Sequence, residues 1–230
     1  MAPVFEVCLD SVASAIIAEK NGSKRIELCA GLMEGGITPS AGLIATVKAK
    51  TSLPVMVMWL VDAAQPMLGR SYFIHNAEHY ERKLRSTTTS SSFSPASLKS
   101  NAVTFHRAFD MTKDPFQALE DIIEIGGIQR ILTSGCERSA YEGLDMLVEL
   151  SKRADGRIII MPGAGITDRN VNKIVSAMNA TEVHVGAGGT QESKMEFRNP
   201  YCSMGYAVSA PEYSLRITSG SKLDAMIQKF

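Results

Sequence analysis

The sequence repeats short apolar runs separated by helix-like stretches, and this repeat restricts the fold more than any other feature. Successive runs begin about 21 to 29 residues apart, with one longer interval. The stretches between them carry helix start and stop signals, such as Pro115 and Gly126 in "DPFQALEDIIEIGG". Seven strands are predicted, at residues 4–8, 25–28, 54–58, 102–106, 130–134, 157–161 and 182–185. Strands that alternate with helices predict an α/β fold with a parallel sheet, here a TIM-like (β/α) barrel.

The interval between Met58 and Ala102 breaks this repeat. It holds about 43 residues, nearly two repeat units, and its second half is "RSTTTSSSFSPASLKSN", which is too polar for a core strand. Either the barrel has an incomplete or irregular fourth unit, or a neighbouring segment fills the gap. We therefore expect a single domain over residues 1–230 with a loosely packed Ser/Thr-rich loop at about residues 85–100.

Charge and cysteine content narrow the class of partner. The chain has 24 basic and 24 acidic residues, so the balance argues against nucleic acid or an anionic membrane as a partner. No apolar run approaches the length of a membrane span, and the start "MAPVFEV" lacks the features of a signal peptide. The four cysteines are too scattered for a disulfide framework. We expect a cytoplasmic protein with small partners, whose cysteines are free thiols, metal ligands or core residues.

Four of the predicted strands alternate apolar residues with ionisable or polar ones. Because side chains alternate across a strand, the apolar set should meet the outer helices and the other set should point into the barrel. The inward set is Glu6, Cys8, Glu27, Cys29, Thr104, His106, Glu182 and His184. An ordinary barrel interior holds branched apolar side chains, so this composition predicts a functional site.

Cys8 and Cys29 are the candidate metal ligands within this set. If their strands are neighbours about 4.8 Å apart, two thiolates at matching heights can share one ion. Soft sulfur ligands favour Cu(I) over hard cations. His106 is a candidate third ligand. The alternative is that both cysteines are small buried apolar residues, since cysteine is among the most buried residue types.

Six segments of the sequence together resemble the CutC copper-homeostasis family, in the family's order. They are "FEVCLDSVASA", "RIELCAGLMEGGITPS", "VTFHRAFDMTKDP", "RILTSGC", "MPGAGITDRN" and "KMEFRNP". The resemblance implies a TIM-like barrel, a cytosolic role in copper homeostasis, and copper bound by cysteines, which are Cys8 and Cys29 here. The chain departs from the family after the third strand and at residues 186–188, where "GAG" replaces a usual Ser-Ala-Arg and removes a basic group.

The same interior also permits an enzyme, of lyase or isomerase type, that acts on a small phosphorylated or anionic substrate. Acids and bases that converge in a low-dielectric interior have perturbed proton affinities, which general acid–base catalysis requires. The candidate catalytic residues are Glu27, His106, Arg107 and Asp110, with Arg107 as an anion clamp. The turn with Gly163 and Gly165 would bind phosphate through its backbone N–H groups. These features also fit a polar network that fixes strand register and an ordinary strand-to-helix turn.

The prediction that follows from both lines of reasoning is a cytosolic copper-binding protein with Cu(I) held by Cys8 and Cys29 near the barrel mouth. The enzyme is the alternative. The region beyond the last predicted strand is longer than one closing helix needs, which leaves homo-oligomerisation open.

Overall fold

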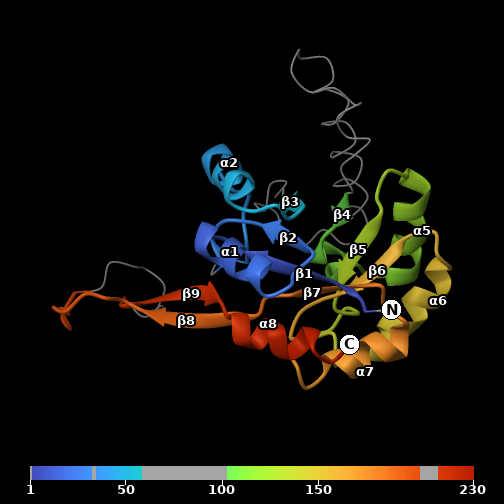
Figure 1. Cartoon of the computed structure of the whole chain (residues 1–230). Helices are drawn as coiled ribbons and strands as arrows, with labels where there is room; N and C mark the ends of the chain where they lie inside the picture. The colour runs from blue at the N-terminus through green and yellow to red at the C-terminus, as the bar shows by residue number, and fades with distance from the viewer. Residues whose placement is uncertain (1, 33–34, 59–102, 203–211) are drawn as a thin grey trace, which may run out of the picture.

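The computed structural model describes residues 2–32, 35–58, 103–202 and 212–230 (Figure 1). The expected irregular fourth unit and the Ser/Thr-rich loop at 85–100 lie outside the described residues.

All of the predicted strands are present in the described part of the chain. The strands are β1 (Val4–Leu9), β2 (Arg25–Leu28), β3 (Val55–Val57), β4 (Thr104–Phe105), β5 (Arg130–Thr133), β6 (Ile159–Pro162) and β7 (Glu182–Val185). Each overlaps its predicted range, and only the ends move by a few residues. The recurring apolar runs therefore identified the strands correctly.

These strands form two parallel sheets with the strand order of a (β/α) barrel. One sheet has the order β3-β2-β1-β7 and the other has the order β4-β5-β6. The two sheets meet where β6 contacts β7. Neighbours in space are thus neighbours in sequence from β1 to β3 and from β4 to β7, and β7 returns to β1. This order confirms the predicted fold class.

The helices lie on the outer side of the strands. They are α1 (Val12–Lys20), α2 (Ala41–Lys50), α5 (Pro115–Ile125), α6 (Leu144–Ala154), α7 (Val171–Met178) and α8 (Gly220–Ile227), with a 3-10 helix, η2 (Arg107–Met111). Figure 1 shows α1 and α2 beside β1 and β2, and α5 and α6 beside β5 and β6. Side-chain caps fix the starts of α1 and α5: Ser11 accepts from the Ser14 N–H, and Asp114 accepts from the N–H groups of Phe116 and Gln117.

The apolar set of the alternation forms the hydrophobic core between strands and helices. Val7, Ile26, Leu28 and Val183 are fully buried there. Their neighbours in the strands are buried polar residues on the opposite face: Glu6, Glu27, Glu182 and His184. The period-two pattern thus places a layer of ionisable groups on the inward face of the strands, as the sequence predicts.

A β-hairpin that the sequence did not predict follows β7. Strands β8 (Gly188–Glu192) and β9 (Ser214–Thr218) pair antiparallel, and Thr190 faces Arg216. In Figure 1 the hairpin extends away from the parallel strands, with α8 following it. The hairpin contributes to the candidate site, because its residues Gly188 and Arg216 line the same pocket as Cys8.

Candidate metal centre

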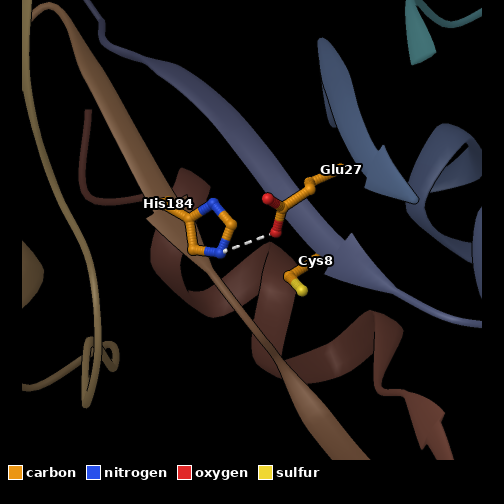
Figure 2. Close-up of side chains that lie close together, drawn as sticks. All are labelled: Cys8, Glu27 and His184. Atoms are coloured by element: carbon orange, nitrogen blue, oxygen red, sulfur yellow. Dashed lines mark ion pairs between the residues drawn. The ribbon is translucent and has the colours of Figure 1, made fainter. Parts of the chain in front are cut away.

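The register of three adjacent strands brings Cys8, Glu27 and His184 together. Cys8 pairs with Glu27 across β1 and β2, while Glu6 pairs with His184 across β1 and β7. One ligand atom from each of Cys8, Glu27 and His184 lies within 4.8 Å of the other two. Figure 2 shows the three side chains converging, with His184 Nε2 3.6 Å from Glu27 Oε2. The site therefore offers sulfur, oxygen and nitrogen donors at one point.

Cys29 lies beside this group. Its Sγ is 3.9 Å from Cys8 Sγ, its backbone N–H donates to Leu9 O at 3.0 Å, and its thiol contacts the same carbonyl at 3.4 Å. Cys29 is fully buried, whereas Cys8 is half-buried. The expectation of matching heights was wrong, because the register pairs Cys8 with Glu27 and Cys29 follows the end of β2. The two thiols meet diagonally instead.

The side chains of Met58 and Cys29 both lie beside Gly36. Gly36 has φ of +93°, which only glycine adopts easily, and a Cβ built there would lie 2.9 Å from Met58 Sδ and 3.6 Å from Cys29 Cβ. The glycine therefore lets Met58 and Cys29 both pack against the backbone of this loop.

Burial and neighbouring side chains set the pKa values of Cys8 and His184. The contact with Cys29, then burial, then the charge of Glu27 raise the pKa of Cys8, so this thiol is protonated at neutral pH. Burial acts to lower the pKa of His184, but the hydrogen bond with Glu6 and the charges of Glu27 and Glu6 outweigh it, and the pKa is raised. A metal ion bound to Cys8 must displace the thiol proton.

A buried network of charged side chains holds the Nδ1 side of the His184 ring. Glu6 Oε1 lies 2.9 Å from His184 Nδ1, and Glu6 also pairs with Arg25. Arg25 continues to Glu182, whose carboxylate accepts from Arg130 Nε at 2.8 Å. Burial acts to raise the pKa of Glu6, but the hydrogen bond and charge of His184 and the charge of Arg25 lower it overall. Part of the polar interior is thus a network that ties β1, β2, β5 and β7 together.

Arg107 and Asp110, predicted as clamp and acid or base, form a second cluster at the end of β5. The Asp110 carboxylate accepts from the Thr133 hydroxyl, from the Ser134 N–H and hydroxyl, and from the Cys136 N–H at 3.2 Å. Arg107 donates to Asp110 at 2.8 Å and to the Ser134 hydroxyl at 2.9 Å. These bonds hold η2 against the loop after β5.

His106, predicted as a third metal ligand or as an acid or base, begins η2. Its Nδ1 accepts from the Ala108 N–H at 2.9 Å, which leaves Nε2 for other partners. Its role in binding or catalysis stays a prediction.

The glycines predicted to bind phosphate have steric reasons to be glycine. A Cβ on Gly163 would lie 2.5 Å from Leu132 Cδ1 and 3.3 Å from His184 Cβ. Gly165 has φ of +65°, and a Cβ there would lie 2.8 Å from Ser139 Cβ. Gly163 therefore lets β6 approach the ring of His184, and phosphate binding by this turn stays a prediction.

A small pocket of about 80 Å³ opens beside Cys8. Its wall includes Asp10, Gly188 and Arg216, and the guanidinium of Arg216 lies 3.3 Å from where a Cβ on Gly188 would stand. The sequence lacked a basic group in this loop, and the unpredicted hairpin supplies one. The sequence pattern placed His184 correctly in the inward set, but it gave no reason to group His184 with Cys8 and Glu27.

Parallel strands in barrel order, with ionisable and sulfur-bearing side chains gathered inside them, define a (β/α)-barrel protein with a candidate metal-binding interior. The chain belongs to the CutC family, whose sequence profile matches residues 4–67 and 90–189.

Relatives of known sequence support this assignment. The chain is 41% identical to the copper homeostasis protein cutC homolog of Homo sapiens, over 96% of this chain and 86% of the relative. It is 38% identical to a CutC family protein of Parabacteroides distasonis, over 99% of this chain and 100% of the relative.

Two solved structures share the fold. A CutC protein from Streptococcus agalactiae has a TM-score of 0.61 and 22% identity, covering 80% of this chain and 98% of that one. N-(5'-phosphoribosyl)anthranilate isomerase from Pyrococcus furiosus has a TM-score of 0.52 and 11% identity, covering 99% of this chain and 98% of that one. Within the described residues, no helix is long and apolar enough to cross a membrane.

Proposed function

We propose that this chain binds Cu(I) through Cys8 and Cys29 and acts in copper homeostasis in the cytoplasm. The observation that carries the proposal is the 3.9 Å separation of the two Sγ atoms inside the barrel. Two neighbouring thiolates are the donors that select Cu(I), and the reducing cytoplasm keeps them available. The names of the curated relatives support copper homeostasis as the role.

The geometry of the pair favours three-coordinate copper. If each metal–sulfur bond is about 2.3 Å, as for zinc thiolates, the S–metal–S angle at this separation is about 116°. This angle is close to trigonal and far from linear, so a third donor completes the site.

The test is a competitive titration of the reduced protein with Cu(I) and a colour-forming chelator. We expect one tightly bound copper per chain in the parent, and its loss in the Cys8→Ser, Cys29→Ser double variant. The matched control is Cys136→Ser, Cys202→Ser, which removes two thiols elsewhere and should bind as the parent does. Circular dichroism establishes that each protein is folded. If the parent and both variants leave copper with the chelator, the proposal fails.

The alternative function is an enzyme that acts on a small anionic substrate. The observation in its favour is the pocket beside Cys8, which carries the exposed Arg216 on its wall. A screen of phosphorylated small molecules by thermal shift tests it. A ligand that stabilises the parent, and stabilises Arg216→Gln much less, would support this function.

A further inference from the structure

The cluster in Figure 2 offers a donor set different from that of the cysteine pair. It combines one thiol, one carboxylate and one imidazole, with one ligand atom from each of Cys8, Glu27 and His184 within 4.8 Å of the others. Zn²⁺ is bound by these three ligand types at about 2.0–2.3 Å, whereas Cu(I) prefers sulfur. We propose that Cys8, Glu27 and His184 form a binding site for a borderline divalent cation of the zinc class.

The hydrogen bond at His184 Nδ1 supports metal binding at the other ring nitrogen, Nε2. A ligating histidine in proteins almost always donates its other ring N–H to a carboxylate or carbonyl, which fixes the ring and raises its basicity. Glu6 Oε1 lies 2.9 Å from His184 Nδ1, so Nε2 is the nitrogen that faces Glu27 and Cys8. Glu6 is itself held by Arg25 and is 1% exposed. This arrangement matches the carboxylate–histidine pair that orients ligating histidines in metal centres.

The charges and the spacing also fit a dication. The Glu27 carboxylate and a Cys8 thiolate supply two negative charges, which balance a divalent ion in a buried place. Two atoms bonded to one tetrahedral zinc lie about 3.3–3.8 Å apart. The side chains must close by about 1 Å from their present 4.8 Å limit, and rotation of Cys8 and Glu27 can achieve this.

The site leaves one position open toward solvent. Cys8 lines the small pocket of about 80 Å³, so a cation can approach its sulfur from there. Three protein ligands with an open fourth position are typical of zinc sites that bind water or a substrate. The inference shares Cys8 with the proposed copper pair, but it depends on Glu27 and His184 in place of Cys29, so each can fail without the other.

The experiment measures Zn²⁺ binding by calorimetry and Co²⁺ binding by the sulfur-to-cobalt charge-transfer band, in the reduced protein. His184→Gln and Glu27→Gln should each weaken Zn²⁺ binding by at least about 100-fold, more than a lost supporting residue would, and both should still bind Cu(I). Cys29→Ser should lose Cu(I) and keep its Zn²⁺ affinity within about 3-fold. Mg²⁺ should not compete, because it needs oxygen ligands.

A measurement on the parent chain covers the case in which a variant does not fold. The sequence has four histidines, so their ring nitrogens can be followed separately by NMR. Zn²⁺ should shift the Nε2 signal of one histidine, His184. The inference is overturned if the folded parent does not bind Zn²⁺, if binding moves no signal of His184, or if Zn²⁺ affinity depends on Cys29 and not on His184.

Discussion

Replacing Glu6 by Gln should destabilise the protein far more than the same change at a surface ion pair. Glu6 is 1% exposed, pairs with Arg25 and contacts His184 Nδ1 at 2.9 Å. Glutamine keeps the shape but removes the charge, which leaves a buried guanidinium and imidazole without their shared anion. Breaking a buried pair in this way costs about 3–5 kcal/mol. In a chain of this size the melting temperature should fall by on the order of 10 °C.

The matched control is Glu120→Gln. Glu120 also pairs with an arginine, Arg157, through contacts of 2.7 and 2.8 Å, but both side chains are about half exposed. Exposed ion pairs contribute little to stability, so this variant should melt close to the parent. Urea unfolding followed by circular dichroism gives both stability differences. Equal losses in the two variants would refute the argument that burial makes the Glu6 network important.

The pH dependence of the stability difference between the parent and Glu6→Gln is a second check. The pKa of Glu6 is lowered in the folded protein, chiefly because His184 and Arg25 outweigh the effect of burial. A lowered pKa gives stability that is fully present above the unfolded value of about 4.3 and is lost as the pH falls through the folded value. The gap between the parent and Glu6→Gln should therefore be full at pH 7 and shrink below about pH 4.3. A gap that stays constant down to pH 3 would contradict this assignment.

The remaining predictions concern packing and thiol reactivity. Gly163→Ala should lose about 1–3 kcal/mol of unfolding free energy, because its Cβ would lie 2.5 Å from Leu132 Cδ1; Gly186→Ala, with nothing within 4 Å, is the matched control. Similar melting temperatures for the two would argue against tight packing at His184. Cys136 has its pKa raised to about 11 by burial and by the charges of Asp110 and Glu137, so mass spectrometry should find it alkylated by iodoacetamide at pH 8 much more slowly than the exposed Cys202. Faster labelling of Cys136 would contradict the structure.

The inward set was predictable because it depends only on strand period. Glu6, Glu27 and His184 follow apolar residues in short strands, so their face could be assigned without coordinates. Which of them meet depends on register between strands, which the sequence pattern does not give. The Cys8–Glu27 pairing and the diagonal approach of Cys29 are consequences of that register.

The hairpin of β8 and β9 shows a different limit. Its first strand, Gly188–Glu192, contains two glycines and three polar residues, which is not a strand pattern. Its partner strand, β9, begins more than twenty residues later, so no short turn sequence predicts the pairing. The arrival of Arg216 beside Gly188 and Cys8 was for that reason not foreseen.

X-ray absorption at the copper edge, on reduced protein loaded with one Cu(I) per chain, is the most direct test of Cys8 and Cys29 as the copper ligands. We expect two sulfur neighbours at about 2.2–2.3 Å, as for metal thiolates, in a three-coordinate centre, and the loss of this signal in Cys8→Ser, Cys29→Ser. A centre without sulfur, or one that persists in the double variant, would contradict the assignment of Cys8 and Cys29 as the copper ligands.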